Sequence, residues 1–556
     1  MTDVPEFAAH ATRRHTSGGA RALAVLAYLV AAICILPMLA VVVASVSGGT
    51  ETISHLMDTV LGRYAFNTFA LVGLVATGAF AVGVGAAWLV TMTRFPGARV
   101  LEVALVLPLA FPAYVLAYAY THVLDHPGVV QSSLRDLMGW GPRDYWFPEI
   151  RSLGGAAMML TLVLYPYVYL LARAAFLQQS ATAFLAARAL GKTAWQAFFK
   201  VSLPMARPAI AGGVLLAVME TIADFGTVAY FGVQTLATGI YTSWFSLADR
   251  AGAAQLALCL LAFALLLAVL ERYQRGDARY HDAGKRRQSM PRIELRGWRA
   301  ALASGLCAVP VVFGCLLPAI VLFEMGLGSE QDLLSRRYIG FIQNSLILAG
   351  SAALLTVSAA IAVGFYQRLR PGPRSAAAGY AARLGYAVPG GVIAVGLIVP
   401  FAAFDNALDA WMRARFDYST GLLITGSIWL LVGAYMVRFL AAALGAYEGG
   451  QSTVHANMDA AARSLGQTPI GTLRRVHLPI LTPSLLTALL IVFVDVMKEL
   501  PATLIMRPFN FDTLAVQAYR LASDERLEGA AVPSLVIVAV GLLPVILICR
   551  QVGRQR

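Results

Sequence analysis

Two pairs of carboxylates recur within apolar stretches of this 556-residue chain. Glu220 and Asp224 lie four residues apart, and Asp495 and Glu499 repeat that spacing 275 residues later. A spacing of four places both carboxylates of a pair on one face of a helix. A charge at the centre of a bilayer costs at least ~2.5 kcal/mol, so such residues usually face a bundle interior or an aqueous path. Oxygen ligands suit hard cations.

Two interpretations of these pairs stay open. In the first, the four carboxylates line a path along which a cation makes weak and transient contacts, because a tight site would slow its release. In the second, they pair with basic residues such as Lys498 and cap a helix that is broken at Pro501. The sequence predicts no firm metal site and no bound cofactor.

The composition is typical of a membrane protein. Hydrophobic residues make up 58% of the chain and charged residues 13%, about half the usual charged share of soluble domains. About twelve apolar runs have the length that a membrane-spanning helix needs, and a lipid-exposed sheet edge would leave peptide groups unpaired. The runs lie near residues 23–47, 67–92, 101–123, 154–174, 208–232, 253–271, 300–325, 343–366, 379–403, 420–442, 482–506 and 531–549.

The distribution of the charges behind the net charge of +13 indicates how the chain is oriented in the membrane. When both termini are placed in the cytoplasm, Lys and Arg concentrate on the cytoplasmic segments and acidic residues on the opposite side, as the positive-inside rule requires. The basic balance therefore indicates a lipid bilayer rather than a nucleic-acid partner. We expect a multi-pass membrane protein with both termini in the cytoplasm.

The sequence is duplicated. AARALGKTAWQAFFKVSLP at 186–204 matches AARSLGQTPIGTLRRVHLP at 461–479, and Asn67 and Pro112 match Asn344 and Pro389. Each copy holds about six predicted helices, so both copies insert with the same polarity, as parallel repeats do. We therefore predict an all-α protein with these parts: a cytoplasmic segment 1–22, a first half 23–271 with a loop at about 175–207, a basic linker 272–299, a second half 300–549 with a loop at about 443–481, and a tail 550–556.

Both copies of the nineteen-residue motif fall between the fourth and fifth helices of their half. Gly191 is placed to end a short helix, and Pro204 marks the entry to the next span. The triplet of Gly191, Lys192 and Thr193 is not a phosphate-binding loop, because Ala186 stands where that loop needs a glycine. We therefore expect no ATP hydrolysis by this chain.

These loops resemble the EAA loop of binding-protein-dependent ABC importers, and the whole chain resembles the fused permeases of the ferric-iron transport family, a type I ABC importer permease architecture. The resemblance implies a location in a bacterial inner membrane and a coupling helix in each loop that inserts into a separate ATPase. It also implies that two ATPase copies and an extracytoplasmic binding protein are partners. The matching positions are Ala186, Ala187, Gly191, Leu203, Pro204, Ala461, Ala462, Gly466, Leu478 and Pro479.

One position departs from the EAA pattern. Leu185 and Ala460 stand where the family has its glutamate, with Asp459 one place earlier. Related permeases carry thiamine, polyamines, phosphonates, sulfate or molybdate, so these solutes are alternatives to ferric iron. An ion-coupled carrier whose protons ride on the four membrane carboxylates is a further alternative. Motifs of membrane enzymes are absent from the sequence, which favours a transport subunit.

Overall fold

The computed structural model describes residues 17–47, 49–179, 181–275, 292–329, 331–332 and 335–554. Within this part of the chain, eleven helices are long and apolar enough to cross a membrane, and a bent pair of helices brings the number to as many as twelve. The prediction of an all-α protein with about twelve spans is confirmed. The candidate spans are Gly18–Ser47, Ser54–Met92, Leu153–Gln178, Trp195–Ala223, Arg250–Leu270, Trp298–Leu327, Arg336–Leu369, Gly390–Phe416, Ile428–Gln451, Pro469–Met497 and Leu527–Ile546.

Several spans end at other places than hydropathy suggests. The run predicted near 101–123 bends by 95° between Ala98–Ala110 and Ala113–Met138. Pro112 stands at this break with extended backbone (φ −64°, ψ 142°), and its repeat partner Pro389 does the same (φ −57°, ψ 144°). A proline cannot donate the backbone hydrogen bond of a helix interior, but it is tolerated next to the first turn. The span that follows Pro389 therefore starts at Gly390, beyond the start that hydropathy predicts at residue 379.

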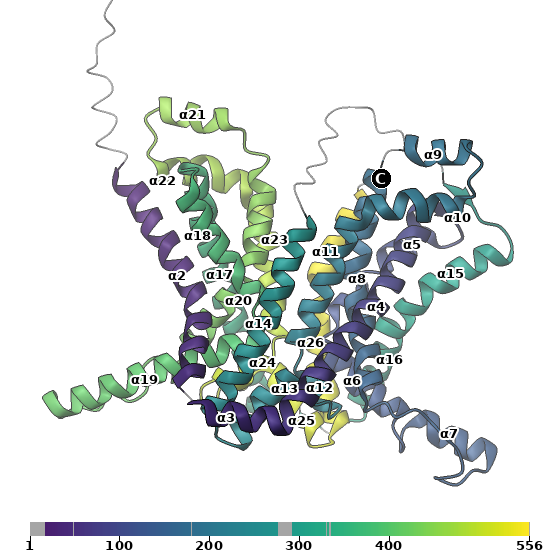
Figure 1. The fold of residues 1–556 in the computed structure, drawn as a ribbon, viewed down its shortest axis with the longest axis horizontal. Coiled ribbons are helices and arrows are strands. Elements are labelled where there is room, and N and C mark those ends of the chain that lie inside the picture. The colour runs from purple at the N-terminus through teal and green to yellow at the C-terminus, as the bar shows by residue number, and fades with distance from the viewer. Residues whose placement is uncertain are drawn as a thin grey trace, which may run out of the picture. The chain divides into compact units, whose positions relative to one another are not determined.

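The chain forms two compact units (Figure 1). Unit 1 comprises residues 1–49 and 336–513, and unit 2 comprises residues 50–335 and 514–556. Each unit therefore combines segments from both copies of the sequence repeat. The boundaries of the two predicted halves remain a prediction about the repeat, and the contacts follow a different division.

In unit 1, the opening helix α2 packs on α17, α18 and α19. The Tyr28 and Tyr366 hydroxyl groups lie 3.1 Å apart, and Ala31 belongs to a buried cluster with Ala378 and Ala381. The helices of this unit are α2 (Ser17–Ser47), α17 (Arg336–Leu369), α18 (Pro373–Leu384), α19 (Gly390–Phe416), α20 (Ile428–Gln451), α21 (Ala456–Ser464), α22 (Pro469–Thr472), α23 (Leu478–Met497) and α24 (Pro501–Met506), with a 3-10 turn at Gly385–Ala387 and a π-turn at Leu473–His477.

In unit 2, the helices α15, α16 and α26 pack against elements of the first repeat. The Tyr120 hydroxyl donates a hydrogen bond of 2.6 Å to the carbonyl of Phe313. The helices are α3 (Gly49–Leu56), α4 (Gly62–Met92), α5 (Ala98–Ala104), α6 (Ala113–Leu124), α7 (Val129–Met138), α8 (Leu153–Gln178), α9 (Ala181–Ala189), α10 (Ala194–Ala197), α11 (Leu203–Ala223), α12 (Gly226–Tyr230), α13 (Leu236–Tyr241), α14 (Arg250–Arg275), α15 (Trp298–Val311), α16 (Leu317–Leu327), α25 (Leu514–Ser523) and α26 (Leu527–Arg554).

Shorter elements complete unit 2. The strands β1 (Thr93–Arg94) and β2 (Ile293–Glu294) pair in parallel. A 3-10 turn covers Leu107–Ala110, and π-turns cover Met57–Leu61, Phe198–Ser202, Thr242–Ser246 and Val312–Leu316.

The repeat is visible in matching contacts. The Asn67 side chain donates to the Gln234 carbonyl at 2.8 Å in unit 2, and Asn344 donates to the Asp512 carbonyl at 3.1 Å in unit 1. The bonds bridge 167 and 168 residues of chain. Duplicated asparagines therefore make equivalent long-range bonds. Most of the predicted N-terminal segment 1–22 and linker 272–299, and the last two residues of the tail, lie outside the described residues.

Candidate functional site

The loop of the first repeat is a helix, a glycine bend and a second helix. After α9 ends at Ala189, the Lys192 amide donates to the Ala187 carbonyl and the Gly191 amide to the Arg188 carbonyl, each at 3.1 Å. Gly191 has a φ of +79°, the left-handed conformation that commonly ends a helix and favours glycine. The helix α10 follows, and α11 begins at Leu203 with Pro204 in its first turn.

The loop of the second repeat has the same backbone. After α21 ends at Ser464, the Gln467 amide donates to the Ala462 carbonyl and the Gly466 amide to the Arg463 carbonyl, each at 3.0 Å. Gly466 has a φ of +75°. The helix α22 follows, and α23 begins at Leu478 with Pro479 in its first turn. The predicted helix, bend and helix are therefore present in both repeats.

Each loop presents an apolar tip. Leu190 is 81% exposed and Leu465 is 78% exposed, at equivalent positions beside the bend. Ala186 and Ala461 are also exposed, whereas Ala462 is buried. Within unit 2, α9 and α10 lie at the end of the bundle opposite α7 and α25, and within unit 1, α21 and α22 lie opposite α24 (Figure 1). At each tip an exposed leucine thus lies beside a left-handed glycine, at one end of its unit.

The first loop is held by an aromatic cluster. The ring of Trp88 on α4 lies 4.2 Å from the ring of Phe198 and 6.2 Å from that of Phe184, measured between ring centres. Phe176 on α8 lies 6.0 Å from the same Trp88 ring. All four side chains are buried. This cluster joins the loop to two candidate membrane spans by apolar contact.

The second loop is held by contacts between ionisable side chains. Asp459 on α21 makes one contact of 2.7 Å with His477 and another of 2.7 Å with Arg368 on α17. Arg368 also donates to the Val454 carbonyl at 2.7 Å. Burial alone would raise the pKa of Asp459, but the hydrogen bonds from His477 and Arg368 outweigh it and lower that pKa below its ordinary value. Asp459 therefore has partners within its own chain.

The first carboxylate pair lies at the end of α11 in unit 2. The Asp224 carboxylate accepts hydrogen bonds from the Thr227 amide at 3.1 Å, the Val228 amide at 3.2 Å and the Thr227 hydroxyl at 3.0 Å. It thus caps the short helix α12, whose first amides have no partner within the helix. Glu220 is half-buried one turn earlier.

The second pair lies at the end of α23 in unit 1. Glu499 accepts from the Ala502 amide at 3.0 Å and the Thr503 amide at 3.2 Å, so it caps α24, and it also contacts Arg438 at 3.3 Å. Asp495 pairs with Lys498 at 2.9 Å. These are the contacts that the structural interpretation expects for three of the four carboxylates.

The cation pathway stays a prediction. Within the described residues, no three His, Cys, Asp or Glu side chains gather closely enough to hold a metal ion.

Comparison with known proteins agrees with this geometry. Residues 79–279 match the family model of the binding-protein-dependent transport system inner membrane component. This match includes the whole first loop and the Asp224 cap. This part of the chain is similar to that family of permeases.

Some relatives match both repeats of the chain. The Fe(3+)-transport system permease protein FbpB 2 of Haemophilus influenzae is 26% identical over 521 residues, which cover 92% of this chain and 95% of the relative. The ferric transport system permease protein FbpB of Actinobacillus pleuropneumoniae is 24% identical over 514 residues, 87% and 70% of the two chains. The molybdenum transport system permease protein ModB of Escherichia coli is 27% identical over 190 residues, 33% and 80%.

The structure also reveals an ion cluster that the sequence did not indicate. Arg151 forms a bidentate pair with Glu525 at 2.7 and 2.8 Å and contacts Asp125 at 3.0 Å, and its guanidinium lies 5.2 Å from the centre of the Tyr230 ring. The hydrogen bond from Arg151 lowers the pKa of Glu525. Arg151 and Glu525 are separated by 374 residues, so no local pattern could have found them.

A second ion pair, in unit 2, is buried. Arg173 on α8 contacts Glu102 on α5 at 2.6 Å, with side chains only 3% and 6% exposed. The Tyr169 hydroxyl donates to the Glu102 carbonyl at 2.7 Å. A buried pair of this kind is costly to break, because either partner alone would be an uncompensated charge. It fixes the end of α8 close to the first loop.

Proposed function

We propose that this chain is the transmembrane subunit of an ATP-driven importer that carries ferric iron into a bacterial cell. The observation that carries the proposal is the duplicated loop, which has one backbone conformation in both repeats and an exposed leucine at each tip. Relatives that are named as ferric-iron permeases and span most of the chain support the cargo.

In this proposal the energy comes from two copies of a separate ATPase. One copy binds the loop around Gly191 and the other binds the loop around Gly466, both on the cytoplasmic side, where the two chain termini also lie. An extracytoplasmic binding protein delivers the iron to the opposite side. ATP-driven closure of the ATPases then moves the permease between outward and inward access, and no ATP or cofactor binds to this chain itself.

Replacing the loop glycines tests the coupling. At both positions a new side chain meets nothing within 4 Å, so Gly191→Val and Gly466→Val act through the backbone alone. The left-handed conformation costs other residues about 1–2 kcal/mol, which makes the bend roughly tenfold rarer. We expect both variants to insert normally, to lose most of their transport and to stimulate the ATPase poorly.

Gly445→Val is the matched control. Gly445 also has open space, but it lies within the regular helix α20, so its replacement leaves no left-handed position strained. Full transport by both loop variants, measured in proteoliposomes with the ATPase, would contradict the coupling role.

The cargo is tested on the binding protein that purifies with the complex. Iron bound to that protein supports the proposal. Molybdenum would favour a molybdate permease, the alternative supported by the ModB relative. Transport without any ATPase, driven by an ion gradient, would instead favour a secondary carrier.

Glu220 is the carboxylate with which we propose to test the cation pathway. Asp224 and Glu499 are engaged as caps, whereas Glu220 has no hydrogen bond or ion pair to another described residue. Glu220→Gln should therefore lower iron uptake while assembly is unchanged. Glu499→Gln should instead reduce stability, because Arg438 loses its charged partner. Unchanged uptake in Glu220→Gln would leave the carboxylates with structural roles only.

A further inference from the structure

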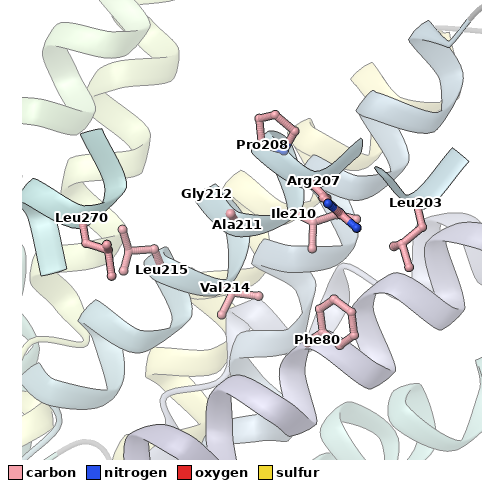
Figure 2. A pocket seen from close by; sticks show the side chains of 10 residues that line it. All are labelled: Phe80, Leu203, Arg207, Pro208, Ile210, Ala211, Gly212, Val214, Leu215 and Leu270. Atoms are coloured by element: carbon pink, nitrogen blue, oxygen red, sulfur yellow. The ribbon is translucent and has the colours of Figure 1, made fainter. Parts of the chain in front are cut away.

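An apolar pocket of about 460 Å³ opens between three helices of unit 2. Its floor is α11, from Leu203 to Leu215, and its sides carry Phe80 of α4 and Leu270 of α14 (Figure 2). The helices α4 and α14 touch where the rings of Phe69 and Phe263 lie 4.5 Å apart. The pocket lies further along both helices, on the side of the first loop.

Nine of the ten residues that line this pocket are apolar or glycine, and the tenth is Arg207. Arg207 is exposed and forms no hydrogen bond or ion pair with another described residue. It lies one turn after the start of α11 at Leu203 and within a candidate membrane span. An arginine at this depth reaches toward the headgroup region, because leaving its charge unpaired in hydrocarbon is costly.

The charge around the pocket selects the kind of ligand. The first loop also carries Arg188, Lys192 and Lys200 but no acidic residue. A guanidinium binds phosphate through two parallel hydrogen bonds, and clusters of basic residues beside a span attract anionic lipids. The apolar floor and sides fit an acyl chain. An anionic phospholipid has both parts in one molecule.

We propose that this pocket binds one anionic phospholipid, with the phosphate on Arg207 and an acyl chain between Phe80 and Leu270. The site belongs to the first repeat. The position that corresponds to Arg207 in the second repeat is Thr482, whose hydroxyl donates to the Leu478 carbonyl at 2.8 Å. The lipid would thus bind next to one coupling loop and not the other.

The test is native mass spectrometry of the permease with its ATPase, after removal of lipid and addition of phosphatidylglycerol or phosphatidylcholine. The wild type should retain one phosphatidylglycerol, and Arg207→Gln should retain it roughly tenfold more weakly, because the variant loses a charge-assisted hydrogen bond to the phosphate. Arg207→Lys should restore part of the retention.

A second variant tests the acyl chain without touching the charge. Ala211→Trp fills the pocket beside Arg207 and should also weaken retention. Lys200→Gln, which removes a loop cation that does not line the pocket, is the matched control and should keep most of the retention, because it reduces only the general basic charge beside the span. The proposal is overturned if phosphatidylcholine is retained equally well, if Lys200→Gln loses the lipid as Arg207→Gln does, or if Ala211→Trp retains it fully.

Discussion

The two coupling loops share a backbone but not a means of attachment. At the offsets of the repeat, Trp88 corresponds to Phe365 and Phe184 to Asp459, while Ser202 corresponds to His477. In the second loop His477 lies 4.9 Å from the Phe365 ring and contacts Asp459, whereas the first loop packs rings on Trp88. The bend needs a glycine in both repeats. The anchor needs only some strong contact, so its chemistry has diverged.

The largest loss of protection from proteases is expected for Phe184→Ala in the first loop. Phe184 is 4% exposed, and removing a buried phenyl ring costs about 3–5 kcal/mol. The loop should become sensitive to proteases in its resting state, and this can be measured as cleavage between α8 and α11. Phe199→Ala is the control, because Phe199 is 49% exposed in the same loop. Equal protection of both variants would mean that the aromatic cluster does not hold the loop.

A smaller effect is expected for Asp459→Asn in the second loop. The substitution removes the charge that faces Arg368 and His477, and a hydrogen bond to a charged group contributes about 1.5–3 kcal/mol. Cleavage should increase between α20 and α23 while the first loop stays protected. The control is Glu448→Gln, which breaks the exposed pair with Arg383 and should cost at most about 1 kcal/mol. If the control opens the second loop as far as Asp459→Asn does, the ionic anchor is not specific.

The smallest effect is a difference in pH dependence. The pKa of Asp459 is lowered in the folded protein, so its pair stabilises the second loop above the ordinary pKa of about 3.9. That contribution is lost as the pH falls below about 4 toward the lowered value. The first loop lacks carboxylates and should not change over this range. Hydrogen exchange of each loop between pH 6 and about 3 checks the difference, and a parallel loss in both loops would argue against it.

Local patterns predicted the parts of the site that depend on neighbouring residues. The duplicated glycines, Gly191 and Gly466, adopt the left-handed conformation that the motif suggests, and Pro112 and Pro389 both stand where a helix begins. Hydropathy placed about twelve spans but extended one of them to residue 232. Asp224 ends α11 earlier by capping the next short helix, and hydropathy does not register such a hydrogen bond.

Contacts between segments that are distant in the sequence could not be predicted from it. Nothing near Arg151 indicates Glu525 as its partner, and nothing near Asp459 indicates Arg368, because a single sequence does not report which helices are neighbours. For the same reason, the sequence could not predict which helices form each of the two units. The repeat gave twelve helices in two sets of six, yet α2 packs with helices of the second repeat, and α15 and α16 pack with those of the first.

This exchange of helices bears on how such a chain is made. A ribosome that has finished only the first repeat has released α2 before any of α17, α18 or α19 exists, so its buried face, including Ala27 and Cys34, must wait in lipid for more than half of synthesis. Two separate genes encoding the repeats would yield polypeptides that each lack helices of their own bundle. A single fused gene supplies both in equal number and in the same patch of membrane.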